Sequence, residues 1–286
     1  MPENRVGTFL AVPMKYQIMI AIFWILGVGI GSWLFSRIFG AKRRGIVGAL
    51  WPAAQFLLFL AVVTVFAYVF VPSFNPFRPL LSRVAGREKV LVLTFDDGPN
   101  EPFTSEILDL LKGRGLKATF FLLGKNAERY PEVVKRIVEE GHQIGNHTYS
   151  HRPLITLDET QIAGEIEGWE KVMAPLGIHT NLFRAPHGWK VPWLYSVLDR
   201  KNYQLIAWTR GVWDTDQPGE EILFQRLTEH LASGEIILLH DGIETRIEPD
   251  RSQLLKVLPR VLDYYRDQGY EIIPLSQVKN GISGEI

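Results

Sequence analysis

The chain has 286 residues, with 31 acidic and 31 basic side chains and no cysteine. The lack of cysteine excludes disulfide bonds and thiol catalysis. The charge is distributed unevenly, because residues 1–80 carry seven basic side chains and one acidic one, which leaves 24 basic and 30 acidic side chains in the remainder. A main domain with a balance of −6 does not have the basic surface of a nucleic-acid-binding protein, so we expect no nucleic-acid partner.

The first 77 residues contain two long uncharged runs, 21 residues from Tyr16 to Ser36 and 33 residues from Gly45 to Phe77. At about 1.5 Å per residue in a helix, each run can cross a hydrocarbon core roughly 30 Å thick. A secretory signal peptide fits poorly, because the first run exceeds the usual apolar length and no small-residue cleavage site follows it. We therefore predict a membrane anchor over residues 1–77, with transmembrane helices at about 16–36 and 46–71.

The charges around these runs predict how the chain is oriented. Residues 37–44, between the two runs, hold four basic side chains. Short basic loops tend to stay in the cytoplasm, so both flanks of the anchor are expected on the other side of the membrane. Basic residues such as Arg83 and Arg87 follow the second run, but they belong to a large domain and count less. We expect a linker at 78–87 and an extracytoplasmic catalytic domain at 88–286.

From residue 88 onward, short apolar runs alternate with amphipathic segments such as Thr104–Lys112 and Glu220–Ala232. This alternation predicts an α/β fold with parallel strands. About seven strands in about 200 residues favour a distorted (β/α) barrel, although an open sheet gives the same periodicity. The predicted strands are Lys89–Leu93, Lys117–Leu122, Gln143–Gly145, Asn181–Phe183, Tyr203–Trp208, Glu235–Leu239 and Tyr270–Ile273.

Two adjacent carboxylates, Asp96 and Asp97, follow the first of these strands in the stretch Thr94–Pro99. Like charges side by side are costly unless a metal ion or an arginine neutralises them. Asp and Gly are also ordinary turn residues, so this stretch alone is equally consistent with a solvated turn.

A second signal is His147-Thr148-Tyr149-Ser150-His151, just after the third predicted strand. A spacing of four places both imidazoles on one face of a helical turn, where they can share one metal ion. Such a pair is more often polar surface when it stands alone. Its position at the carboxyl end of a strand, where parallel α/β folds place their active sites, favours a functional interpretation.

Three more polar clusters follow later strands: Arg184–Gly188, Gly211–Asp216 and Leu238–Gly242. Singly, these are consistent with a turn, an exposed charge and a core histidine. Five polar clusters at the carboxyl ends of five strands instead favour one shared active site.

Together, these five segments resemble the polysaccharide deacetylase family with the NodB homology domain (carbohydrate esterase family 4), over about residues 88–276. The resemblance implies a distorted (β/α) barrel that removes N- or O-acetyl groups from sugars with the help of a metal ion. It implies that Asp97, His147 and His151 hold a divalent ion, most simply zinc, with cobalt or nickel possible. Asp96 would act as the catalytic base, and Arg184 would pair with it and orient it.

The resemblance also implies that His240 is the catalytic acid and that Asp214 tunes it, with Asp216 as a weaker rival for that role. A backbone N–H of the turn at 186–188 would stabilise the oxyanion, and Leu239 would line a pocket for the acetyl methyl group. The expected substrate-binding residues are Pro186, His187, Gly188, Trp213 and Leu239.

The chain departs from the family pattern at three positions. His187 replaces a common aromatic residue, Thr215 replaces a tryptophan, and Gly211 replaces a frequent aspartate. These departures fall on the expected substrate groove, so the metal site is better defined by the sequence than the groove.

The expected function is removal of N-acetyl groups from an amino-sugar polymer such as peptidoglycan or a GlcNAc polysaccharide, at a membrane surface. The alternatives are deacylation of a lipid-linked saccharide, removal of O-acetyl groups from a xylan-like polymer, or a non-catalytic carbohydrate-binding module. Retention of Asp96 and His240 beside all three expected ligands favours an enzyme, since a binding module has no chemical need for them.

Overall fold

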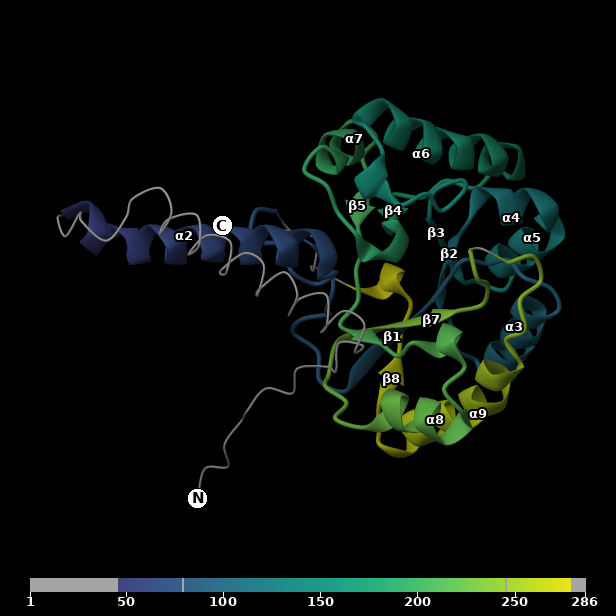
Figure 1. Cartoon of the computed structure of the whole chain (residues 1–286). Coiled ribbons are helices and arrows are strands. Elements are labelled where there is room, and N and C mark those ends of the chain that lie inside the picture. Colours follow the sequence, from purple (N-terminus) through teal and green to yellow (C-terminus); the bar gives the residue numbers. More distant parts are fainter. Residues whose placement is uncertain (1–45, 79, 245, 279–286) are drawn as a thin grey trace, which may run out of the picture. The chain divides into compact units, whose positions relative to one another are not determined.

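The computed structural model describes residues 46–78, 80–244 and 246–278 (Figure 1). The chain divides into two compact units, residues 1–67 and 68–286. Helix α2, Ile46–Phe70, covers the second predicted membrane span, whereas the first, at about 16–36, lies outside the described residues. Among the residues that the structure describes, no helix is both long and apolar enough to cross a membrane.

Eight strands in the described residues form one sheet, and every pairing between named strands is parallel. The order is β5-β4-β3-β2-β1-β7-β6, with β8 attached to β1, and the sheet curls into a half-barrel (Figure 1). This confirms the α/β class and the parallel sheet. The strands are β1 Val90–Asp96, β2 Thr119–Leu122, β3 Gln143–Asn146, β4 Leu182–Phe183, β5 Gln204–Leu205, β6 Arg210–Gly211, β7 Glu235–His240 and β8 Glu271–Ile272.

Helices cover the outer side of the half-barrel, and local sequence explains where some of them begin. Pro131 occupies the first turn of α5, where the missing N–H costs nothing. Asp158 and Gln161 form a capping box at the start of α6. The helices of the larger unit are α3 Phe103–Gly113, α4 Gly124–Arg129, α5 Pro131–Glu139, α6 Glu159–Met173, α7 Leu194–Arg200, α8 Glu220–Thr228 and α9 Ser252–Asp267.

Strand β1 is buried along its whole length, and its two faces enter different apolar clusters. Leu93 and Phe95 pack in the cluster that contains residues of α3 and α9. Val92 packs on the other face with Ile236 of β7. Because side chains alternate along a strand, Asp96 lies on the face of Val92, inside the half-barrel.

The segment before β1 forms part of the sheet. Leu81 forms a parallel bridge with Ile206, just after β5, and Arg83 forms an antiparallel bridge with Glu235 at the start of β7. Leu81 and Val84 are both buried. Residues 81–84 therefore connect the chain beyond β5 with the beginning of β7.

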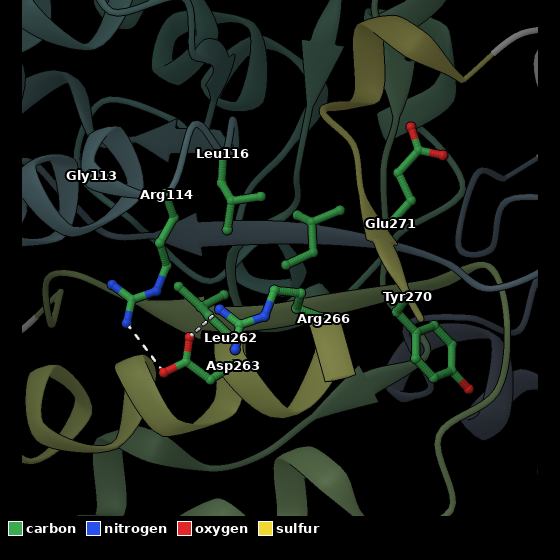
Figure 2. Close-up of a pocket in the computed structure, with 9 residues that line it drawn as sticks. Gly113, Arg114, Leu116, Leu262, Asp263, Arg266, Tyr270 and Glu271 are labelled. Carbon is green, nitrogen blue, oxygen red and sulfur yellow. Dashed lines mark hydrogen bonds and ion pairs between the residues drawn. The ribbon is translucent and has the colours of Figure 1, made fainter. Parts of the chain in front are cut away.

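A pocket of about 380 Å³ lies between the ends of α3 and α9 and strand β8 (Figure 2). Asp263 forms ion pairs with Arg114 and Arg266 at its wall. None of the site residues expected from the sequence lines this pocket.

Candidate active site

The carboxylate of Asp96 is held by a buried arginine. Arg184, at the end of β4, is completely buried, and its guanidinium donates to Asp96 Oδ1 over 2.7 Å. The same nitrogen donates to Thr94 Oγ1 over 2.7 Å, and the guanidinium lies 4.0 Å from the ring centroid of Phe121. These contacts fix the orientation of the Asp96 carboxylate and satisfy its charge inside the half-barrel.

Asp97, His147 and His151 converge as expected from the sequence. Asp97 Oδ1 lies 3.5 Å from His147 Nε2 and 3.4 Å from His151 Nε2. Two ligand atoms that each lie about 2.0–2.1 Å from a tetrahedral ion are about 3.3 Å apart, so this spacing fits a metal ion the size of zinc. The three residues are all buried.

The chemical state of these three groups also fits a cation. Burial lowers the pKa of His147 to about 4 and the pKa of His151 well below its ordinary value, so both imidazoles are neutral at pH 7 and have a lone pair to offer. Burial raises the pKa of Asp97 to about 8, and its Oδ1 has no hydrogen-bond partner among the described residues. A positive charge at this point would compensate the buried Asp97 carboxylate, whose Oδ1 lacks a hydrogen-bond partner among the described residues.

A backbone carbonyl selects which nitrogen of His147 faces the site. His147 Nδ1 lies 2.8 Å from the carbonyl oxygen of Arg184. A proton on Nδ1 donates to that carbonyl, which leaves the lone pair on Nε2, the nitrogen nearest Asp97. Arg184 therefore serves both halves of the site, through its side chain for Asp96 and through its backbone for His147.

The prediction of a helical turn at 147–151 is wrong. These residues form a loop after β3, in which Thr148 and His151 have left-handed backbone conformations, with φ of 70° and 64°. Hydrogen bonds from the Thr148 N–H to Asn146 Oδ1 and from the His151 N–H to Thr148 Oγ1 hold the loop. Asp97, with φ of 74°, shares this strained geometry, which is typical of functional sites.

His240 lies on the other side of Asp96 and is paired with Asp214. His240 Nδ1 lies 2.9 Å from Asp214 Oδ1, and the His240 backbone N–H donates to Asp214 Oδ2 over 3.0 Å. Burial lowers the pKa of His240, but the Asp214 carboxylate outweighs it and raises this pKa to about 9. The imidazole therefore carries a proton at neutral pH, as a general acid requires.

Sequence reasoning missed Arg251, which supports this pair. It is 1% exposed, forms an ion pair with Asp214 and donates from Nε to the carbonyl oxygen of His240 over 2.9 Å. Arg251 lies outside the five motifs, just before α9, so no local signal marked it. Asp216, the rival for Asp214, has no contact with His240 among the interactions found in the described residues.

The expected substrate-binding residues lie in different environments. Pro186 and Gly188 are buried, whereas His187 is exposed and its ring lies 4.7 Å from the ring of His151. Trp213 is 40% exposed. Leu239 is completely buried in the cluster shared with α3 and α9, on the face of β7 opposite His240, so it does not reach the acetyl position expected for it.

A second group of possible metal ligands lies beside the first. His151, His187 and Glu244 have ligand atoms within 4.8 Å of one another. Glu244, on the loop after β7, was not expected from the sequence. This group shares His151 with the first group and includes the exposed His187, so we regard it as the solvent-exposed edge of the same site.

Comparison with known proteins identifies the family. The polysaccharide deacetylase profile matches residues 83–214. A peptidoglycan-N-acetylglucosamine deacetylase of Bacillus cereus is 32% identical over 200 residues, covering 68% of this chain and 90% of that protein. The chain belongs to the polysaccharide deacetylase family, whose members are hydrolases.

Other relatives show the range of substrates in this family. A chitooligosaccharide deacetylase of Bradyrhizobium is 30% identical, covering 73% of this chain and 98% of that protein. The crystal structure of a peptidoglycan N-acetylglucosamine deacetylase superposes with a TM-score of 0.66 at 29% identity, covering 72% of this chain and 97% of that one. A carbohydrate esterase family 4 pseudoenzyme with restored activity superposes with a TM-score of 0.63 at 25% identity, covering 72% of each chain.

Proposed function

We propose that this protein removes N-acetyl groups from an amino-sugar polymer, such as peptidoglycan or a GlcNAc polysaccharide, by metal-assisted hydrolysis. The observation that carries the proposal is the arrangement around Asp97, His147 and His151: an arginine-paired carboxylate, Asp96, and an aspartate-paired histidine, His240, lie beside them. A sugar-binding module without catalysis has no use for an acid and a base placed in this way.

Hydrolysis of an acetamide needs a nucleophile, a polarised carbonyl and a proton donor at once. Asp97, His147 and His151 would hold the ion, with zinc favoured by one carboxylate and two imidazoles. A divalent ion in such a site polarises a carbonyl and lowers the pKa of a water molecule.

The base and the acid divide the proton transfers. Asp96 Oδ2 lies 3.5 Å from His147 Nε2, so this carboxylate faces the metal position and takes a proton from the attacking water. The water oxygen bonds to the acetyl carbon, the carbon–nitrogen bond then breaks, and His240 donates its proton to the departing sugar amine. The products are acetate and a free amine, and each proton transfer contributes about 10² to 10⁴ in rate.

The oxyanion needs a hydrogen-bond donor, and we look for it in the turn at 186–188. His187 and Gly188 have left-handed backbone conformations, with φ of 57° and 69°. Pro186 has no N–H, and the Gly188 N–H donates to the carbonyl oxygen of Ala185, so His187 carries the remaining N–H of this turn. We assign a backbone N–H of this turn to the oxyanion and the rings of His187 and Trp213 to the sugar. Supporting this assignment, the turn follows β4, and the ring of His187 lies 4.7 Å from the ring of His151, one of the proposed metal ligands.

Purified full-length protein, loaded with zinc and mixed with N-acetylated chito-oligosaccharides or peptidoglycan fragments, tests the proposal through the release of free amine. Acetate release from acetylated xylan without amine release would favour the O-acetyl alternative. Activity only on isolated lipid-linked saccharides would favour that substrate instead. A protein that binds oligosaccharide but releases no acetate from any of the three would be a binding module.

We further propose that residues 1–67 of the anchor expected over 1–77 hold the catalytic domain on the outer face of the cell membrane. Supporting this, Phe56, Leu57 and Leu58 of α2 are 60%, 65% and 67% exposed, which is unfavourable in water and favourable in lipid. Protease treatment of intact spheroplasts should digest the catalytic domain. Protection of residues 90–286 would place this domain in the cytoplasm.

A further inference from the structure

The loop that carries the proposed substrate-binding turn is attached to residues 68–72, which the sequence assigned to the membrane anchor. These residues form the end of α2 and the turn after it, and they belong to the larger unit. Tyr68 is 6% exposed and packs in an apolar cluster with residues of α6 and α7. The segment is therefore part of the packed catalytic unit.

Lys190 makes the central contact, and it is only 1% exposed. Its ammonium donates to the carbonyl oxygens of Val71 and Pro72 over 2.7 and 3.0 Å, and its backbone N–H donates to the carbonyl oxygen of Val69 over 3.1 Å. A lysine ammonium is costly to bury, and here it satisfies two backbone carbonyl groups just after the last residue of α2, where a positive charge is favourable.

Packing continues from this segment toward the metal ligands. The ring of Phe70 lies 5.5 Å from the ring of Trp189, which lies 4.7 Å from the ring of His187. The ring of His187 in turn lies 4.7 Å from that of His151.

Gly188 shows how close the loop and the segment are. A β-carbon on Gly188 would lie 2.6 Å from Pro72 Cγ, closer than two carbon atoms can approach, and its φ of 69° also disfavours a side chain. Only glycine therefore allows this turn to rest against the segment.

We propose that Lys190 is a positioning residue, which uses residues 69–72 as a support to hold the turn at 186–188 in place for the sugar. This inference rests on the proposed function. It implies that the active site is incomplete without the end of α2, although the family match begins at residue 83.

Residues 75–78, which follow this support in the chain, contact α7. Asn75 donates to the hydroxyl of Tyr195, and Arg78 forms an ion pair of 2.5 Å with Asp199, both on α7. The Arg78 guanidinium also lies 5.4 Å from the centroid of the Tyr195 ring. The segment thus contacts α7 as well as the loop.

The test compares Lys190→Met with Lys201→Met in the full-length protein. Lys201 also pairs through its ammonium, but with Glu167 and Glu170 of α6, away from the turn. Because a displacement of about 1 Å in a positioning group costs up to about 10²-fold, we expect Lys190→Met to lower kcat/KM for chito-oligosaccharides by about ten- to a hundredfold, mainly through KM. Zinc content should stay at the wild-type value, and Lys201→Met should match the wild type.

Phe70→Ala and Phe70→Tyr provide a second pair in case Lys190→Met does not fold. The ring contact with Trp189 is lost in the first variant and kept in the second, so only Phe70→Ala should raise KM. A lower melting temperature with an unchanged KM in both Lys190→Met and Phe70→Ala would overturn the inference and leave these residues a purely structural role. An inactive wild-type protein would instead count against the proposed function.

Discussion

Asp96 and His240 are register partners on the neighbouring strands β1 and β7. Their side chains therefore leave the sheet on the same inner face. Each is held by a partner of opposite charge, since Asp96 contacts Arg184 and His240 contacts Asp214. A proton acceptor and a proton donor thus stand next to each other without having to pair with one another.

Replacement of Asp96 by asparagine should remove nearly all turnover and leave the metal in place. The amide keeps the size of the side chain but cannot accept the proton, so the rate should fall by about 10² to 10⁴. Amine release and zinc content, measured on the same preparation, check this. Loss of zinc from Asp96→Asn would show that Asp96 is a ligand.

Replacement of Asp97 by asparagine should instead lower the metal content. Asp97 Oδ1 is the atom on which both imidazoles converge, and an amide oxygen is a weaker ligand for zinc than a carboxylate. Equilibrium dialysis against zinc should show weaker binding than in the wild type, with Trp213→Phe, outside both groups of possible ligands, as the control. Wild-type zinc binding by Asp97→Asn would reverse the roles of the two aspartates.

The alkaline limb of the pH–rate profile should report His240. A general acid works only while it is protonated, so activity should decline as the pH rises through the His240 pKa of about 9. In Asp214→Asn the charge that raises this pKa is gone, and the limb should move to lower pH, toward the ordinary value of 6.5. Asp216→Asn is the matched control, and a shift there instead would make Asp216 the partner.

Removal of Arg184 should destabilise the fold as well as the site. Arg184→Met leaves the Asp96 carboxylate buried without its counter-charge, which costs about 3–5 kcal/mol. The midpoint of urea unfolding measures this cost. Arg260→Met breaks an exposed ion pair with Glu221 and should leave the midpoint close to the wild-type value. Equal midpoints in the two variants would show that Arg184 is not needed to satisfy Asp96.

The sequence was informative where a residue type and its place after a strand both carry meaning. Asp97, His147 and His151 were expected to meet, and the structure brings them within ligand distance. The reason given for the two histidines was nevertheless wrong, because spacing alone cannot separate a helical turn from a loop with two left-handed residues. Only the long-range register of β1 and β3 against β2 brings these loops together.

Other parts could not be predicted because their signal is not local. Strand β6 has two residues, too few for a periodic pattern. Arg251 lies 11 residues after the end of β7, so it is not part of a motif directly after a strand. Leu239 is an exception. Side chains alternate between the two faces of a strand, so its separation from His240 on β7 could have been predicted from the sequence. The docking of residues 68–72 on Lys190 depends on tertiary contacts between segments more than 100 positions apart.

Strand β1 is paired on both sides, with β2 and with β7, over the rows that end at Asp96. A single residue inserted before Thr94 would place Phe95 opposite His240 and shift Asp96 and Asp97 by one position along the chain. The site would then be lost, although every catalytic side chain would still be encoded. Exchanges among Val, Leu and Ile in this strand should be tolerated far better than any change in its length. Length, more than composition, therefore constrains how this stretch of the protein can vary among functional descendants.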